Sequence, residues 1–255
     1  MEVNNKIYAK EASCMNEVFS LIDSFLKNKK SSCWIAFDVD YTITMPALNI
    51  DNVEMPITKE NFIQAFSEIK CKTKEEIDIV LSSVLFTSNI LVDQKTPEII
   101  KELQKRDNVT VFAPTACLYT REIENIRFNT LNAHGINFQN AFEVSELILD
   151  KIPIYHKHFP KYSNGIIYAN GENGSHNKGT VMEAFMKKMQ KVPQIFMIVD
   201  DRRKNIEDLY AIFSKEYPDV EFFGILYHPK NDFQKIQPEI LSEQISKIAS
   251  KMTNN

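Results

Sequence analysis

Four carboxylates stand directly after two predicted strands. Asp38 and Asp40 follow a short apolar run, and Asp200 with Asp201 follows another. Ligands of parallel sheets bind where the carboxyl ends of the strands meet, so we expect these side chains to lie at one edge of a sheet. A group of carboxylate oxygens with no thiol nearby suits Mg2+ better than zinc. The four acids therefore predict a magnesium site.

A hydroxyl and an amine occupy equivalent positions on two further segments. Thr115 follows a third apolar run, and Lys178 begins a predicted helix after a fourth. Both side chains are expected to join the carboxylates at the same edge. Asp38 and Asp40 alone are also compatible with a simple turn, and Asp200 with Asp201 is compatible with the cap of the following helix.

The segments that must position these side chains alternate between strands and helices. Strands are predicted at 34–37, 109–113, 165–169, 194–199 and 220–226. Helices are predicted at 18–26, 96–106, 121–133, 178–190 and 204–215. Strands separated by helices indicate an α/β fold with a mainly parallel sheet.

The pattern changes within residues 45–93. Prolines 46 and 56 indicate a loop, and two helices are predicted at 58–70 and 73–86 from their capping residues and apolar spacing. We therefore expect a small all-helical cap at 45–93, inserted into a core made of residues 1–44 and 94–255. The 14-residue charge-free run before Asp93 is too short and too polar to cross a membrane, and we interpret it as a buried helix.

A last helix is predicted at 238–252, with one apolar face that includes Leu241 and Ile245. Packing of this face on the core of the same chain is the first interpretation. A partner protein or a membrane surface is the alternative.

Composition narrows the function classes. The formal net charge is -4 and the sequence pI is about 5.8, so no global positive field would attract nucleic acid. The four cysteines are far apart and form no zinc motif, which is typical of reduced thiols in the cytoplasm. The first 17 residues have no apolar segment of the signal-peptide kind. We expect a cytoplasmic protein without a transmembrane segment.

The ordered set of Phe37-Asp38-Val39-Asp40-Tyr41-Thr42, Thr115, Lys178 and Val199-Asp200-Asp201 resembles the four motifs of the haloacid dehalogenase (HAD) superfamily of phosphatases. The resemblance covers about residues 15 to 230. It implies a Rossmann-like core with helices on both faces of the sheet, a Mg2+ ion and a phospho-aspartyl intermediate. The spacing is similar to that of a bacterial branch that includes effector-type tyrosine phosphatases of intracellular pathogens, for which delivery into a host cell by a non-classical route is a further expectation.

The resemblance also implies a role for each motif residue. Asp38 would be the nucleophile and Asp40 the acid and base of a phosphatase. Thr115, the amide of Ala116 and Lys178 would hold the phosphoryl group. The metal would be bound by Asp38, the backbone of Val39 next to Asp40, Asp200 and Asp201.

Some positions depart from the family pattern, and they bear on the choice of substrate. Cys117 stands where an arginine is often found, Val199 replaces a common glycine, and Tyr41 is larger than usual. A phosphorylated protein side chain, including phosphotyrosine, and a small sugar or nucleotide phosphate both stay open as substrates. A phosphate-binding pseudo-enzyme or interaction protein is the alternative of a different class. Asn205 is a candidate for orienting Asp200 or Asp201.

Overall fold

The computed structural model describes residues 9–50, 52–68, 87–155, 157–230 and 236–253. The chain forms two compact units. The first comprises Met1–Ile43 and Asp93–Lys230, and the second comprises Thr44–Val92 and Asn231–Asn255. Both units are therefore discontinuous in sequence.

The first unit is built on an eight-stranded sheet with the strand order β1-β11-β10-β2-β6-β9-β8-β7. The first six strands of this order run parallel, and β8 and β7 are added antiparallel. The strands are β1 (Ala9–Ala12), β11 (Glu221–Tyr227), β10 (Ile195–Asp200), β2 (Cys33–Phe37), β6 (Val109–Thr115), β9 (Ile166–Tyr168), β8 (Lys161–Ser163) and β7 (Glu146–Ile148). The predicted α/β class with a mainly parallel sheet is confirmed.

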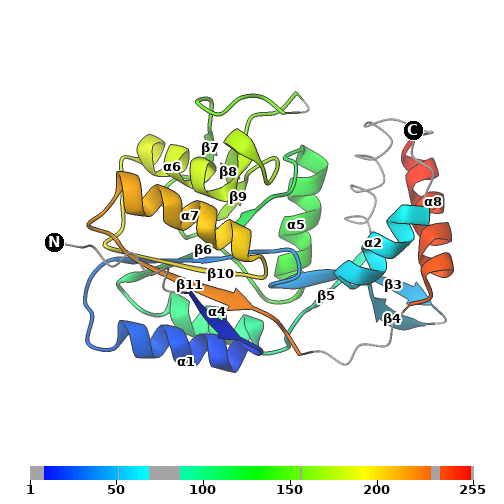
Figure 1. Ribbon diagram of the computed structural model, residues 1–255, viewed down its shortest axis with the longest axis horizontal. Coiled ribbons are helices and arrows are strands. Elements are labelled where there is room, and N and C mark those ends of the chain that lie inside the picture. Colours follow the sequence, from blue (N-terminus) through cyan, green and yellow to red (C-terminus); the bar gives the residue numbers. More distant parts are fainter. Residues whose placement is uncertain (1–8, 51, 69–86, 156, 231–235, 254–255) are drawn as a thin grey trace. The chain divides into compact units, whose positions relative to one another are not determined.

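Helices cover both faces of this sheet. Figure 1 shows α6 and α7 on one side and α1 and α4 on the other. The helices of the unit are α1 (Met15–Leu26), α4 (Thr96–Gln104), α5 (Arg121–Ala133), α6 (Lys178–Met189) and α7 (Arg203–Glu216). Every residue of β2 is buried, because a strand covered on both faces has no solvent side.

The order in which the chain adds strands to the sheet reverses at β2, while the strands on both sides of β2 stay parallel to it. From β2 the chain proceeds to β6 and β9 on one side, and it later returns to β10 and β11 on the other. The crevice at such a reversal point is where open parallel sheets bind ligands. The carboxyl ends of β2 and β10 are therefore the expected place for a site.

The second unit holds strands, so the expectation of an all-helical insertion is wrong. Strand β3 (Thr44–Ile50) pairs antiparallel with β4 (Val53–Pro56) and with β5 (Ser88–Leu91). Proline normally marks loops or edge strands because it lacks the backbone donor, and Pro46 nevertheless lies in the central strand. Residues 88–91, which we interpreted as part of a buried helix, form β5 instead.

One predicted helix of the second unit is present, and another lies outside the described residues. Helix α2 (Lys59–Glu68) replaces the predicted 58–70, and the Thr58 hydroxyl accepts a hydrogen bond from the Asn61 amide at 3.2 Å. The helix expected at 73–86 falls on residues that the structure does not describe.

The C-terminal helix α8 (Pro238–Thr253) belongs to the second unit, not to the core in which we placed it. It packs against α2, and its Leu241 and Ile245 side chains are fully buried. Asn61 on α2 donates a hydrogen bond to the Ile236 carbonyl at 3.2 Å. The predicted apolar face is thus covered by the same chain, although by a neighbour that the periodicity could not identify. None of the helices that the structure describes has the length and apolar character needed to cross a membrane.

Candidate functional site

Two neighbouring strands bring Asp38 and Asp200 together. Strands β2 and β10 pair up to Phe37 and Val199, and the Asp38 amide continues the ladder by donating to the Val199 carbonyl at 2.9 Å. Both aspartates are buried, with exposed fractions of 4% and 0%. The carboxyl edge of the sheet therefore holds two desolvated carboxylates side by side.

Lys178 lies between these two acids. Its Nζ atom donates to Asp38 Oδ1 at 2.5 Å and to Asp200 Oδ2 at 2.7 Å. Burial disfavours the ammonium, but Asp200 and Asp38 outweigh this effect and raise the pKa of Lys178. The lysine is therefore a permanent cation that links the two carboxylates.

The start of α6 positions Lys178. Asn177 caps the helix by accepting a hydrogen bond from the Thr180 amide at 2.8 Å. Gly179 lets the helix approach α7 closely, since a Cβ atom at this position would lie 2.3 Å from the Asp208 carbonyl oxygen. This glycine is a positioning element that the sequence reasoning did not single out.

Asp38 does not ionise readily in this environment. Burial raises its pKa from the usual 3.8 to about 7, and the charges of Asp200 and Asp40 add to the increase, while Lys178 opposes it. An additional cation close to Asp38 would keep the carboxylate ionised at neutral pH.

The residues that could bind such a cation fit Mg2+. Carboxylate oxygens of Asp38, Asp200 and Asp201 lie within 4.8 Å of one another, and this donor set contains oxygen only. Small divalent cations of the Mg2+ type prefer such ligands, whereas zinc prefers nitrogen and sulfur. The Val39 carbonyl accepts a bond from the Ile43 amide at 3.0 Å, and its second lone pair allows the predicted contact with a metal.

Asn205 holds Asp200 in place. Its Nδ2 atom donates to both carboxylate oxygens of Asp200, at 2.9 and 3.1 Å. The Arg202 amide adds a bond to Asp200 Oδ1 at 2.9 Å. The N-cap position of α7 is occupied by Arg202, so the alternative that the acidic pair serves as that cap is wrong.

Asp40 and Thr115 form the second half of the site. The Thr115 hydroxyl donates to Asp40 Oδ2 at 3.0 Å and accepts from the Cys117 amide at 3.1 Å. Ala116, the next residue after β6, is half-buried. Directly after Asp40, Tyr41 has a φ of 63°, a conformation that is strained for a residue with a side chain. The structure thus brings together all six side chains that the sequence predicted to converge.

Arg127 on α5 is a site residue that the sequence reasoning missed. Its guanidinium is buried and pairs with Asp40 Oδ1. One signal was present in the sequence: Arg127 is four residues from both Ile123 and Leu131, so a charge falls within the apolar stripe of the helix. A buried arginine in such a stripe needs an anionic partner.

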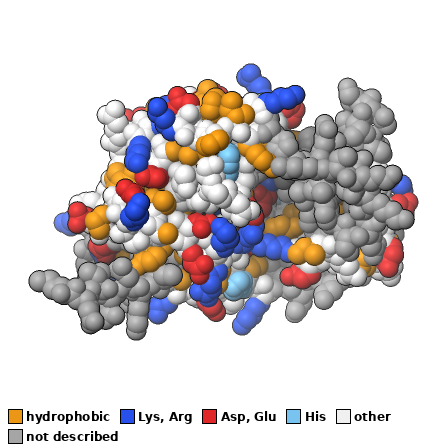
Figure 2. Space-filling view, turned by 45° about the horizontal axis from the view of Figure 1, so that its top comes forward, with side chains coloured by type: hydrophobic (Ala, Val, Ile, Leu, Met, Phe, Trp, Pro, Cys, Tyr) orange, Lys and Arg blue, Asp and Glu red, His pale blue; other side chains and the backbone are white. Residues whose placement is uncertain are grey.

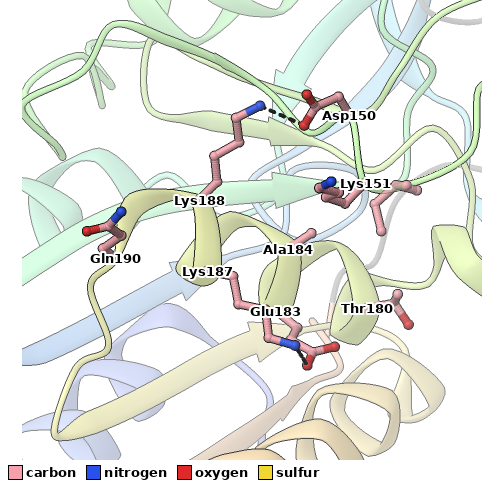
Figure 3. Close-up of a pocket in the computed structure, with 9 residues that line it drawn as sticks. Asp150, Lys151, Thr180, Glu183, Ala184, Lys187, Lys188 and Gln190 are labelled. Atoms are coloured by element: carbon pink, nitrogen blue, oxygen red, sulfur yellow. Dashed lines mark hydrogen bonds and ion pairs between the residues drawn. The ribbon is translucent and has the colours of Figure 1, made fainter.

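The pocket drawn in Figure 3 lies away from these residues. It has a volume of about 640 Å3 and is formed by α6 and residues 150–152. Four of its charged side chains pair with each other, Lys187 with Glu183 at 2.6 Å and Lys188 with Asp150 at 2.7 Å. None of the six predicted site residues lines it, so this pocket is separate from the candidate site.

Acidic and basic side chains are interspersed over the face of the molecule that Figure 2 shows. Among the described residues, Arg202 pairs with Glu172, and Lys204 pairs with Asp208 at 2.5 Å. Much of the basic charge around α7 is therefore balanced locally.

Comparisons with known proteins add one finding. A search of the curated proteins and a search of the solved structures each returned no match. A family model described as "Protein of unknown function (DUF2608)" matches residues 14–255, which is nearly the whole chain. The chain therefore belongs to the DUF2608 family.

Proposed function

We propose that this protein is a Mg2+-dependent phosphomonoester hydrolase that forms an aspartyl-phosphate intermediate on Asp38. The observation that carries the proposal is the bridge from Lys178 to Asp38 and Asp200 at the carboxyl ends of adjacent parallel strands. A nucleophile, a cation and a metal-ligating acid thus share one buried edge. The ordered motifs support the same proposal, through their resemblance to HAD-type phosphatases.

The charge of the site supports a divalent cation. Three acids, Asp38, Asp40 and Asp200, pair with two basic side chains, Lys178 and Arg127, in the ion pairs described. A phosphate dianion would be repelled by the remaining negative charge. Asp38, Asp200 and Asp201 would hold Mg2+, which would supply positive charge that offsets this repulsion and favours ionised Asp38.

The residues of the chain account for both steps of hydrolysis. In the first step, an Asp38 oxygen forms a bond to phosphorus while the ester P–O bond breaks, and the departing oxygen takes a proton from Asp40. In the second step, water attacks the phosphorus of the aspartyl phosphate and gives its proton to Asp40. Inorganic phosphate leaves, and the Asp38 carboxylate is restored. Lys178 and the Thr115 hydroxyl hold the phosphoryl oxygens.

A phosphorylated protein side chain, phosphotyrosine among them, is the substrate class that we propose to test first. It follows from the resemblance to effector-type tyrosine phosphatases. Small sugar and nucleotide phosphates form the competing class. A set of phosphopeptides compared with such small esters decides between them, because kcat/KM is highest for the class that the site recognises.

The test of the reaction is phosphate release from an aryl phosphate, with Mg2+ and with a chelator. Wild type is compared with Asp38→Asn and with Asp23→Asn, a surface control. Activity should require Mg2+, disappear in Asp38→Asn and persist in Asp23→Asn. Borohydride reduction during turnover should convert Asp38 to homoserine in the wild type. Activity that survives the chelator or Asp38→Asn contradicts the proposal, and binding of Mg2+ and phosphate without turnover indicates the pseudo-enzyme.

A further inference from the structure

Both oxygens of the Asp40 carboxylate are held by residues from elsewhere in the first unit. Arg127, 87 residues along the chain, pairs with Oδ1, and the Thr115 hydroxyl donates to Oδ2 at 3.0 Å. The Asp40 side chain is 32% exposed, whereas that of Arg127 is only 3% exposed. The acid therefore faces the open side of the site while the arginine supports it from inside the protein.

An ion pair with a buried guanidinium contributes little net stability to a fold, because desolvation opposes the attraction between the charges. Removing a guanidinium from water is unfavourable, and apolar residues of similar volume are often at least as stabilising. Within the described part of the chain, the buried Nε atom of Arg127 has no hydrogen-bond partner. Burial disfavours the charge, but Asp40 and Cys117 outweigh it and raise the pKa of Arg127. A desolvated charge with an unused donor points to a role in the site.

Helix α5 holds the backbone of Arg127 in a fixed position. The Thr120 hydroxyl caps the helix by accepting from the Ile123 amide at 3.2 Å. Glu124, one turn before Arg127, accepts from the Tyr119 hydroxyl at 2.9 Å and from the Ser163 hydroxyl. The helix is thus tied to the loop after β6 and to β8. The ion pair from this fixed helix, made by one guanidinium nitrogen, then restricts where the Asp40 carboxylate can point.

We propose that Arg127 is the positioning residue of Asp40, fixing the carboxyl group where it can donate its proton to the departing ester oxygen. This inference rests on the proposed phosphatase function and deepens it. Proton donation matters most for esters with poor leaving groups, because the departing oxygen then carries most charge as the P–O bond breaks. Arg127 should therefore matter more for alkyl phosphates than for 4-nitrophenyl phosphate.

The experiment compares kcat/KM for glycerol 2-phosphate and 4-nitrophenyl phosphate in wild type, Arg127→Met and Arg127→Lys. Arg127→Met should lose about 10- to 100-fold on the alkyl ester and less than about threefold on the nitrophenyl ester. Arg127→Lys, which keeps the charge, should recover part of the loss. Arg106→Met removes an arginine from an ion pair with Asp23 outside the site and should leave both values unchanged.

A double-variant cycle separates positioning from a structural role. If Arg127 acts through Asp40, then adding Arg127→Met to Asp40→Asn should produce no further loss on either ester. If Arg127→Met fails to fold, the same comparisons are made with Arg127→Lys, for which a loss on the alkyl ester alone is the expected result. Equal losses on both esters, or additive losses in the double variant, overturn the inference while leaving the phosphatase proposal intact. A wild type without activity on any ester overturns both.

Discussion

Asp38, which we propose as the nucleophile, determines how the charge of the site responds to pH. Its carboxylate is buried beside Asp200, and only the Lys178 ammonium offsets the two negative charges directly among the contacts of the described residues. With a pKa of about 7, the Asp38 carboxyl group in this place changes between its neutral and ionised forms near neutral pH. Protonation of Asp38 is therefore coupled both to the stability of the fold and to the binding of a cation.

The first prediction concerns stability in the absence of divalent cations. The folded-state pKa of Asp38 is about 7 and the usual value is 3.8, so the folded state binds more protons than the unfolded state between these limits. The contribution of Asp38 to the free energy of unfolding must then fall as the pH rises from about 4 to about 7. Asp38→Asn lacks this group. Its stability relative to wild type should increase over the same range and level off above it.

Urea unfolding with chelator present, measured at several pH values, checks this prediction. Asp23→Asn serves as the control, because its carboxylate is exposed and lies outside the site. Parallel pH profiles for wild type and Asp38→Asn would show that the burial of Asp38 has no energetic consequence.

At the scale of elements, the contact between α6 and α7 decides where Lys178 stands. Gly179 is in the first turn of α6, and an added Cβ atom would come within 2.3 Å of the Asp208 carbonyl oxygen. An alanine in an unobstructed helix would stabilise it by about 1 kcal/mol. At this position the backbone of α7 stands in the way, so the two helices would have to separate.

We therefore predict that Gly179→Ala destabilises the protein, by about 1 to 3 kcal/mol, and reduces the proposed phosphatase activity by displacing Lys178. Thr180→Ala, at the next position of the same turn, is the matched control and should change either quantity much less. Denaturant unfolding and kcat with an aryl phosphate measure the two effects. A stabilised Gly179→Ala variant would mean that α6 can shift without cost.

The pairing of α2 with α8 makes the second unit dependent on the C-terminus of the chain. Leu241 is fully buried in this unit, whereas the neighbouring Ile240 is 37% exposed. Truncation of a buried leucine to alanine removes apolar contacts and leaves a cavity, which costs about 2 to 5 kcal/mol. Truncation of the adjacent, exposed Ile240 removes fewer apolar contacts.

The resulting prediction is that Leu241→Ala destabilises the second unit by about 2 to 5 kcal/mol and that Ile240→Ala changes its stability by less than about 1 kcal/mol. Hydrogen exchange of α2 amides reports on this unit directly. Equal protection of α2 in both variants would contradict the assignment of α8 to the second unit.

At the scale of the whole molecule, binding of Mg2+ should raise the free energy of unfolding. A ligand that binds only the folded state raises the free energy of unfolding by about 2.7 kcal/mol when its concentration is 100-fold above Kd. Wild type should therefore show a Tm that rises with Mg2+ concentration. Asp201→Asn, which alters the least buried of the three proposed ligands, should need more Mg2+ for the same rise.

Asp23→Asn is again the appropriate control and should follow the wild type. Thermal unfolding over a range of Mg2+ concentrations, with K+ added to keep the ionic strength constant, measures the effect. An identical response of wild type and Asp201→Asn would place the cation elsewhere.

The sequence by itself determined which segments become the main parallel strands and which polar residues end them. An apolar run covered on both faces is visible in composition alone, as at Cys33–Phe37 and Ile195–Asp200. The short strands β1, β7 and β8 escaped prediction because each contains a charged residue and none is a continuous apolar run, unlike the equally short β9.

Only the tertiary structure decided which distant residues meet. The pairing of Arg127 with Asp40 and that of α8 with α2 both join segments far apart in the chain. A helical period reveals that a face is buried, but not which neighbour buries it, since any apolar surface of suitable shape satisfies the same pattern. The six motif residues could be predicted to converge because five of them end or follow parallel strands at one edge, and Lys178 begins the helix that comes after another of these strands. Arg127 and the C-terminal helix could not, because their partners depend on how whole elements pack.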